Sequence, residues 1–483
     1  MLFFGDTCKP LFSCLSLGSR LSVKLITSTV QTRLFNLEEE GLLKEEDLGQ
    51  WRRTHYSKEV GPAMADREVV IMGWVSSVRD HGNISFIIIK DMHGEVQVTA
   101  KKSEVGEQLF ALAKEVKEHT SLGVRGKVRP QEKAPNGAEV VPAEIKAFSV
   151  AKKAAPFMTT GKSSPVGIDT RLDLRAVDLR RQQLGSIFRI RQTVVNAIRE
   201  FLSRQDFIEV STPKMIATAT EGGAALFPIF YYDREAFLAQ SPQLYKEQLT
   251  MAFESVFEIG PIFRAEPSRT NRHLSEATSV DVERAFADYG DVMALLERMI
   301  IHIIDSVKDR NKADLEFLEI AMPALELPFP KYSYSDLIDK LQEAGERIPW
   351  GDDISPQVMK SLQDERLNGF YFIVDWPTST KPFYVKPKAD DPKVCESFDL
   401  MYGPLEMSSG STRINRKDQL IERMQKQGLK PDAFDYHLRV FDFGVPPHAG
   451  FGMGLERLLM ALAKIENIRD ATFYPRDIDR LAP

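Results

Sequence analysis

The chain has 483 residues, and its 63 lysines and arginines stand against 69 aspartates and glutamates, which gives a formal net charge of -6. This length predicts two to four domains. The acidic balance excludes a globally basic protein, so a nucleic acid would bind through local basic patches. The cysteines are Cys8, Cys14 and Cys395, with no CxxC pair, which excludes a disulfide framework and indicates a reducing compartment. The chain has no run of 18 or more apolar residues, so no membrane span is predicted.

The first 48 residues differ in composition from the rest of the chain. Residues 1–34 contain one acid, Asp6, against four lysines and arginines, which is typical of an organellar transit peptide. Residues 38–47 then contain six acids and one lysine. A translation start assigned too far upstream would give the same pattern, and we favour a start near residue 48. Mass spectrometry of the native N-terminus distinguishes the two interpretations.

Residues 49–150 predict a small β-domain. Three short β-runs are followed by a helix and then by two more β-runs. This is the order of an OB-fold, a partly open barrel that binds oligonucleotides on its middle strands. The predicted strands are 67–75, 84–90, 95–100, 122–129 and 140–150, and the predicted helix begins near 105 and ends at 118.

A basic connection leads from this domain to the second half of the chain. Residues 151–185 contain a stretch with proline, glycine, serine and threonine and are the predicted hinge. Residues 186–202 then place apolar side chains every three to four positions, which predicts an amphipathic helix. A short predicted strand at 207–213 follows and is closed by Pro213.

Charged residues in the second half of the chain predict a nucleotide site. Arg264 and Glu266 stand close together, Arg272 and His273 follow, and Arg457 stands among glycines near the C-terminus. No GxxxxGK[ST] sequence occurs, so a P-loop is excluded. The planar guanidinium of Arg264 can bind an α-phosphate, Glu266 can accept from the adenine amine, and Arg457 can lie on the adenine ring.

This ordered combination resembles motifs 2 and 3 of the class II aminoacyl-tRNA synthetases, near 263–286 and 450–462. Residues 187–213 resemble motif 1, whose proline lies at the dimer interface in this class, so a homodimer is implied. The resemblance covers about residues 51–483 and implies an α+β multidomain fold. The implied parts are an extension at 1–48, an OB-fold β-barrel at 49–150 that binds the anticodon, a hinge at 151–185, and a catalytic domain at 186–483 built on an antiparallel β-sheet flanked by helices.

The segment Gln240–Lys246 resembles the substrate strand of aspartyl-tRNA synthetases of the archaeal and eukaryotic type. A pocket for aspartate must neutralise a buried carboxylate, and Lys246 and Arg413 supply two cations. Asparagine enzymes of the subclass usually lack the lysine. We expect Lys246 to have no partner before the substrate binds, so Lys246→Leu would abolish aspartate activation at little cost in stability.

The resemblance also implies further aspartate-binding residues. Asp281 and Glu221 are the acids expected to hold the substrate ammonium, and the two glycines after Glu221 suit either a closing loop or a static turn. His448 is either near the substrate, as in relatives, or structural. The complete implied set is Glu221, Gln243, Lys246, Asp281, Ser409, Arg413 and His448.

ATP and Mg²⁺ are the implied co-substrate and metal. Asp399 and Glu406 match the family's magnesium ligands, and two neighbouring strands with a turn at 402–404 would bring both acids to one face. The aspartate α-carboxylate attacks the α-phosphorus of ATP without a covalent enzyme intermediate, and Arg264 stabilises the developing charge. The implied catalytic residues are Arg264 and Arg457, and the implied ATP-binding residues are Arg264, Glu266, Arg272, His273, Glu406, Gly454 and Arg457.

The predicted β-barrel carries the implied tRNA contacts. In this subclass, residues at the positions of Phe86 and Gln97 stack on and read the central anticodon base, with Arg79 nearby. Strict archaeal enzymes carry tryptophan at the position of Ser76 and lysine at that of Pro135. Because rejection of a wrong tRNA needs a repulsive or unsatisfied contact, we predict a non-discriminating enzyme that charges both tRNA(Asp) and tRNA(Asn).

Four alternatives remain beside this prediction. A strict aspartyl-tRNA synthetase would discriminate through other residues. An asparaginyl-tRNA synthetase is disfavoured by Lys246, and a stand-alone asparagine synthetase by the barrel. A non-catalytic tRNA-binding paralogue should have lost Arg264, Asp399, Glu406 or Arg457. The expected location is the cytoplasm, or an organelle if residues 1–34 are a transit peptide.

Overall fold

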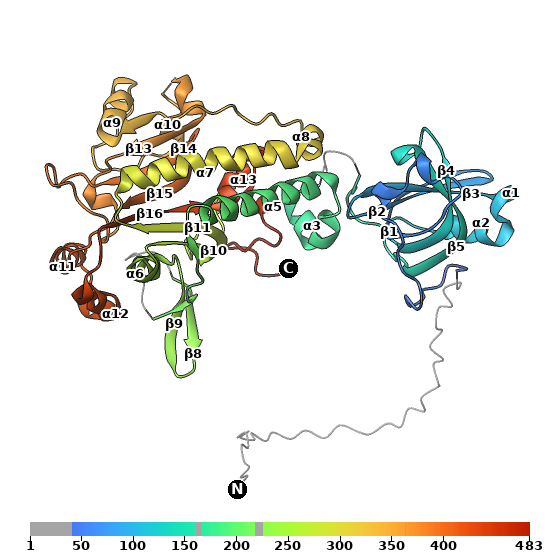
Figure 1. Cartoon of the computed structure of the whole chain (residues 1–483), viewed down its shortest axis with the longest axis horizontal. Coiled ribbons are helices and arrows are strands. Elements are labelled where there is room, and N and C mark those ends of the chain that lie inside the picture. Colours follow the sequence, from blue (N-terminus) through green and yellow to red (C-terminus); the bar gives the residue numbers. More distant parts are fainter. Residues whose placement is uncertain (1–40, 161–165, 218–225, 363) are drawn as a thin grey trace, which may run out of the picture. The chain divides into compact units, whose positions relative to one another are not determined.

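The structure is a computed structural model that describes residues 41–160, 166–217, 226–362 and 364–483. The chain divides into two compact units, one that ends at Ala154 and one from Ala155 to Pro483, and each is described by itself (Figure 1). Glu221 and residues 1–40 lie outside the described residues. None of the described helices is long and apolar enough to cross a bilayer.

The first unit is a closed five-stranded barrel with strand order β1-β2-β3-β5-β4, which confirms the predicted OB-fold. Alternate strand residues such as Ile87, Ile89 and Val98 fill its core. The predicted helix at 105–118 is two shorter helices, because Gly106 breaks it at a φ of 84°. The elements are β1 (Glu68–His81), β2 (Ile84–Asp91), β3 (Gly94–Lys101), α1 (Lys102–Val105), α2 (Glu107–Glu115), β4 (Ser121–Pro130) and β5 (Ala138–Ser149).

The second unit is built on an eight-stranded sheet of order β12-β13-β14-β15-β16-β11-β10-β6. All neighbours are antiparallel except at the two edges, where β12 and β6 pair in parallel. The α+β fold predicted from the resemblance is confirmed. The strands are β6 (Ile208–Glu209), β10 (Ser255–Phe263), β11 (Glu276–Ala285), β12 (Lys331–Ser333), β13 (Phe370–Val374), β14 (Ser397–Tyr402), β15 (Leu405–Thr412) and β16 (His448–Gly454).

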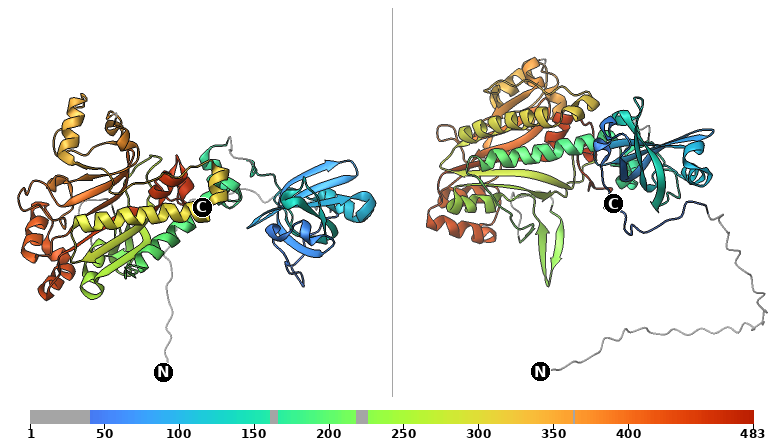
Figure 2. Two further views of the ribbon diagram at one scale, coloured as in Figure 1. Left: turned by 45° about the horizontal axis from the view of Figure 1, so that its top comes forward. Right: turned by 45° about the vertical axis from the view of Figure 1, so that its right-hand side comes forward.

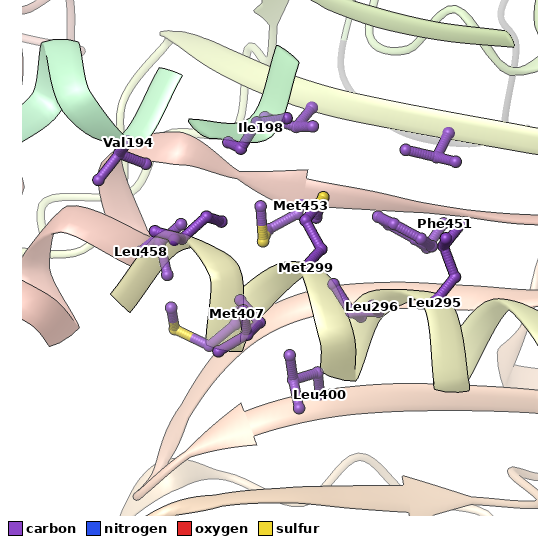
Figure 3. Packing of buried hydrophobic residues seen from close by; sticks show 14 of the residues in the cluster. Val194, Ile198, Leu295, Leu296, Met299, Leu400, Met407, Phe451, Met453 and Leu458 are labelled. Carbon is purple, nitrogen blue, oxygen red and sulfur yellow. The ribbon is translucent and has the colours of Figure 1, made fainter. Parts of the chain in front are cut away.

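Long helices cover one face of this sheet. The predicted amphipathic helix is α5 (Gln182–Ser203), which lies beside α7 (Tyr289–Arg310) in all three views (Figures 1 and 2). Val194 and Ile198 of α5 pack with Met299 of α7 and with strand residues such as Phe451 (Figure 3). The other helices of this face are α8 (Lys312–Leu318) and α13 (Leu455–Ala463).

A second core lies against the opposite face. It contains Leu244, Tyr371, Ile373 and Met401. The short hairpin β8–β9 and β7 form a separate three-stranded sheet. The remaining elements are α3 (Ile168–Asp173), α4 (Arg175–Asp178), β7 (Met215–Ile216), β8 (Pro228–Tyr231), β9 (Arg234–Leu238), α6 (Gln243–Phe253), α9 (Tyr334–Glu343), α10 (Pro356–Met359), α11 (Lys417–Lys426) and α12 (Asp435–Leu438).

The alternation of side chains along β11 decides where a site can form. Val280 and Val282 point into the core under the long helices, so Ser279, Asp281 and Glu283 project from the opposite face. Polar groups are therefore carried on a rigid sheet on the side away from α5 and α7.

Candidate active site

A cavity of about 530 Å³ lies over this polar face of the sheet. Strands β11, β15 and β16, the loop after β10 and the start of α6 contribute to it. Most of the site residues implied by the resemblance meet here, although they are spread over more than two hundred positions. The predicted residues that line the cavity are Gln243, Arg264, Glu266, Arg272, His273, Asp281, Glu406, Ser409, Arg413, Gly454 and Arg457.

At one end of the cavity two arginines are fixed by backbone contacts. Arg264 follows β10 directly, and its N–H donates to the carbonyl oxygen of Ser275 across the hairpin at 2.9 Å. Arg457 stands in the first turn of α13, where its Nη1 donates to the carbonyl oxygen of Glu406 at 3.0 Å. The guanidinium of Arg457 is therefore held in place, whereas the contact of Arg264 fixes its backbone and leaves its planar guanidinium able to turn toward a phosphate.

Burial and neighbouring positive charges favour the neutral form of the His273 ring. Desolvation in the cavity and the positive charges of Arg457 and Arg264 lower the pKa of His273, while Glu266 and Glu406 act in the opposite direction. A neutral imidazole can accept as well as donate a hydrogen bond, so it can contact either phosphate oxygens or the ribose and adenine edge.

The C-terminal segment braces this end of the cavity, which sequence reasoning missed. Ser275 N–H donates to the carbonyl oxygen of Arg476 at 2.7 Å, and Arg269 pairs with Asp479 at 3.0 Å. Asp477 itself lines the cavity. No local sequence pattern links these segments, because about two hundred residues separate them.

Glycines form part of the cavity floor. Gly450, Gly452 and Gly454 alternate along β16 with buried Phe451 and Met453, so they occupy the polar face. A Cβ on Gly450 would lie 2.1 Å from Glu283 Oε2, whereas one on Gly452 would lie 3.3 Å from Asp281 Oδ1. The carboxylate of Glu283 thus excludes a side chain at Gly450. Because these glycines have no side chains, the floor of the cavity has room for a flat ligand.

A β-bulge brings Glu406 and Ser409 to the same face. β14 and β15 form the predicted pair of strands around the turn at 402–404, with Asp399 opposite Ser409 and Met401 opposite Glu406. Residues three apart on a regular strand face opposite sides, but the bulge inserts an extra residue and reverses the alternation. Both Glu406 and Ser409 therefore line the cavity.

Asp399 is less accessible than Glu406. It is 4% exposed, and its two oxygens lie 3.0 and 2.9 Å from Lys381 Nζ. Burial raises the pKa of Asp399, Lys381 opposes this rise, and Glu406 adds to it. Sequence reasoning missed Lys381, which no motif marks.

At the other end of the cavity Lys246 is already paired. Its Nζ lies 3.0 Å from Asp281 Oδ1 and 3.4 Å from Glu283 Oε2, and the side chain is 2% exposed. Arg413 contacts the same Glu283 with two nitrogens, at 3.0 and 3.2 Å. The expectation that Lys246 has no partner in the ligand-free protein is wrong, because the alternating acids of β11 project toward it.

The prediction that Gln240–Lys246 forms a strand is also wrong, because a helix begins within this segment. Ser241 Oγ accepts from Gln243 N–H at 3.1 Å, and the helix α6 begins at Gln243. Its buried polar residues are Gln243, Lys246, Glu247 and Thr250. Lys246 and Glu247 follow Gln243 by three and four positions, and Thr250 follows them by four and three. This helical period shows why Gln243 and Lys246 face the sheet together.

His448 does not line the cavity. It is fully buried at the start of β16, with Nε2 3.6 Å from Glu247 Oε2. Sequence reasoning gave no role to Glu247, although its position four residues after Gln243 on a helix was a usable signal.

On the barrel, the predicted anticodon residues share one outer face. Phe86 pairs with Arg79 on β1 and with Thr99 on β3, and Gln97 stands two residues before Thr99. Gln97 Nε2 donates to Glu139 Oε2 at 2.9 Å. Phe86 is half-buried and Gln97 is 6% exposed, so a ring is available for stacking beside a fixed amide.

The two positions linked to tRNA discrimination lie near Glu95. Ser76 is the extra residue of a bulge in β1 and donates to Glu95 Oε1 at 3.3 Å. Pro135 begins the turn at 135–137 between β4 and β5, where the next residue, Asn136, donates to the carbonyl oxygen of Glu95 at 3.2 Å.

The fold and the cavity define the class of protein. The architecture is that of a class II synthetase with an OB barrel. It combines an antiparallel sheet, the motif 2 hairpin of β10 and β11, and Arg457, which follows the glycine-containing strand β16. Residues 167–478 match the family "tRNA synthetases class II (D, K and N)", and residues 69–148 match the "OB-fold nucleic acid binding domain". The chain belongs to the D, K and N family of class II tRNA synthetases.

Named relatives narrow the comparison. The aspartate--tRNA(Asp/Asn) ligase of Archaeoglobus fulgidus is 47% identical over 89% of this chain and 99% of its own length. The enzyme of the same name from Methanocaldococcus jannaschii is 46% identical over 90% of this chain and 99% of its own length.

Solved structures share the fold. The asparaginyl-tRNA synthetase of Pyrococcus horikoshii in complex with asparaginyl-adenylate is 32% identical, with a TM-score of 0.83 over 89% of this chain and 100% of that one. A putative aspartyl-tRNA synthetase from Leishmania major Friedlin is 26% identical, with a TM-score of 0.81 over 92% and 98%. Aspartyl and asparaginyl enzymes thus share this architecture, so the fold alone does not distinguish the two amino-acid specificities and the residues of the pocket are needed for that.

Proposed function

We propose that this chain is an aspartate--tRNA ligase that acts on tRNA(Asp) and tRNA(Asn). The observation that carries the proposal is a buried pair of cations: Arg413 lines the cavity, and Lys246 lies behind the cavity residue Asp281, 3.0 Å from its Oδ1. A substrate side chain that carries a negative charge requires such cations, whereas a neutral amide does not. The relatives named aspartate--tRNA(Asp/Asn) ligase support the same substrate.

Binding of aspartate involves an exchange of ion-pair partners. In the ligand-free protein, Asp281 and Glu283 neutralise Lys246 and Arg413. The substrate ammonium takes Asp281 as its partner, which frees Lys246 for the substrate side-chain carboxylate. The buried charge then stays balanced, as a low-dielectric site demands. Glu221, proposed as a further acid for the ammonium, lies outside the described residues.

Activation of aspartate requires its α-carboxylate to attack the α-phosphorus of ATP, with pyrophosphate as the leaving group. Arg264 binds the α-phosphate and stabilises the charge that accumulates on it. Arg457 and Glu266 hold the adenine, and Arg272 and His273 bind the outer phosphates or the rim of the nucleotide. The terminal ribose hydroxyl of tRNA then attacks the carbonyl carbon of the aspartyl-adenylate, the acyl–phosphate bond breaks with AMP as the leaving group, and the aspartyl group passes to the tRNA.

Mg²⁺ fits the oxygen-rich edge of the cavity. Glu406 has a half-exposed carboxylate that lines the cavity, and hard oxygen ligands suit this ion. Asp399 can serve as a second ligand once Lys381 releases it. When bound, the ion neutralises charge on the ATP phosphates.

Recognition of tRNA is assigned to the barrel. Phe86 stacks on the central anticodon base and Gln97 reads its edge, with Arg79 beside them. Ser76 is small and Pro135 has no donor, so neither supplies a contact that rejects the anticodon of tRNA(Asn). A strict aspartyl enzyme remains the alternative.

The proposed assembly is a homodimer. An apolar groove next to the motif 1 proline is lined by Pro213, Tyr245, Leu249, Met251 and Phe443, and Phe443 is 82% exposed. A second copy of the chain is the proposed occupant. The proposed location is the cytoplasm.

Exchange of labelled pyrophosphate into ATP tests the choice of amino acid. Aspartate should support exchange and asparagine should not. Exchange with asparagine alone would identify an asparaginyl-tRNA synthetase, and no exchange with any amino acid would support a non-catalytic tRNA-binding protein.

A further inference from the structure

A buried carboxylate lies directly behind the amino-acid end of the cavity. Glu247 of α6 is 1% exposed. Its Oε2 lies 3.5 Å from Nε2 of His437 in α12 and 3.6 Å from Nε2 of His448 in β16. Burial raises the pKa of Glu247, but the two histidines outweigh burial and the pKa lies below its usual range. The group is thus an ionised carboxylate held between two rings.

The contacts of the two rings fix where their protons lie. His448 Nδ1 is 2.8 Å from the carbonyl oxygen of Pro446, which only accepts, so Nδ1 carries a proton. Burial lowers the pKa of His448, but Glu247 outweighs burial and the pKa is raised, which favours a second proton on Nε2, the nitrogen that faces Glu247. His437 Nδ1 is 3.1 Å from Nε2 of Gln248, an amide nitrogen that donates, so the proton of a neutral His437 lies on Nε2. That proton faces Glu247.

The other oxygen of Glu247 is bound to a cavity residue. Gln243 Nε2 donates to Glu247 Oε1 at 2.7 Å, one helical turn away. An ionised carboxylate can only accept hydrogen bonds, so Gln243 must turn its NH₂ group toward Glu247. The carboxamide oxygen is then the group that Gln243, which lines the cavity, offers to a ligand.

We propose that Glu247 is a positioning residue, which holds Gln243 so that its carboxamide oxygen accepts a hydrogen bond from the α-ammonium of the amino-acid substrate. This inference rests on the proposed function. His437 and His448 hold Glu247 in place and act on the substrate only through it. The ammonium therefore has two acceptors from the described residues, Asp281 and the oxygen of Gln243.

Glu247→Gln tests this role, because the substituted side chain keeps the shape but can both donate and accept. Either orientation of Gln243 then becomes possible, and the orientation with NH₂ toward an ammonium is repulsive. In pyrophosphate exchange with the full chain, we expect KM for L-aspartate to rise roughly tenfold, while kcat and KM for ATP change less than about threefold.

Inhibition by succinate distinguishes loss of the ammonium contact from a general structural defect, because a general defect would weaken the binding of succinate as well. It has both carboxylates of aspartate but no ammonium. As a competitor of aspartate, succinate should keep its inhibition constant in Glu247→Gln within about twofold of wild type. Parallel weakening of succinate and aspartate, or an unchanged KM for aspartate, would overturn the proposal.

The matched control is Glu297→Gln, since Glu297 is also a buried acid and accepts from the backbone N–H of Phe329. It should leave KM for aspartate unchanged. If Glu247→Gln does not fold, His437→Gln supplies the test, with a smaller rise in KM for aspartate and no change for succinate; equal effects on both would overturn the proposal. Wild-type protein that shows no aspartate-dependent exchange would instead refute the proposed function.

Discussion

Lys246 illustrates what a sequence does and does not reveal about a single residue. The resemblance marks Lys246 and Arg413 as the cations of the site, but their acidic partners are distant in sequence, since Lys246 and Asp281 are 35 positions apart. The alternation of Ser279, Asp281 and Glu283 was a signal for these partners, because residues two apart on a strand share a face. Lys381 and Glu247 were marked by no family motif.

Replacement of Lys246 by leucine is expected to affect both activity and stability. Aspartate-dependent exchange should be lost, because the substrate carboxylate loses its cation. The free energy of unfolding should also fall by about 3–5 kcal/mol, because Asp281 and Glu283 are left buried with too little positive charge. Chemical denaturation measures this change.

Lys417→Leu is the control for that experiment. Lys417 forms an exposed pair with Asp442 at 2.6 Å, and surface pairs contribute about 0–1 kcal/mol. If Lys246→Leu is as stable as Lys417→Leu, the ion pairs of Lys246 with Asp281 and Glu283 do not contribute to the free energy of unfolding as expected.

At the scale of elements, regular periodicity was predictable and local irregularity was not. The spacing in α5 and the strand order of the barrel followed from apolar patterns. The resemblance of Gln240–Lys246 to a substrate strand does not predict the helix α6, because it covers only the first four residues of that helix. The bulge in β15 had no sequence signature, since it depends on how β14 pairs with that strand.

The glycine floor of β16 gives a prediction for one element. In Gly452→Ala the new methyl group would meet Asp281 Oδ1 at 3.3 Å, so the sheet should still fold while the floor rises under the ligand. We expect KM for aspartate in pyrophosphate exchange to increase roughly tenfold, about 1.4 kcal/mol. Gly369→Ala, where the Cβ meets nothing within 4 Å, should leave KM unchanged; equal effects of both would contradict an open floor.

The outer face of the barrel gives a second prediction at this scale. Phe86→Ala should weaken tRNA binding by about 1–3 kcal/mol, the usual contribution of one base stacked on an aromatic ring. Pyrophosphate exchange should not change, because the cavity lies in the other unit. Phe148→Ala removes another half-buried phenylalanine of the barrel and serves as the control in aminoacylation assays, which should show no change in KM for tRNA.

At the scale of the whole molecule, the exposed groove beside Pro213 predicts self-association. Phe443→Asp would place a charge in the proposed contact between two copies, where burial without a partner is costly. Size-exclusion chromatography with light scattering should show a dimer for the wild type and a monomer for the variant. A wild-type chain that is monomeric at micromolar concentration would contradict the proposed dimer.

The proposed enzyme is specific for aspartate and accepts the anticodons of two tRNAs. One measurement tests both properties. Transcripts of tRNA(Asp) and tRNA(Asn) are aminoacylated separately with labelled aspartate, and kcat/KM is compared. We expect both to be charged with aspartate, with values within about a hundredfold of each other, which corresponds to roughly 2.7 kcal/mol. A stronger preference for tRNA(Asp) would contradict relaxed recognition, and failure to attach aspartate to either tRNA would contradict the function itself.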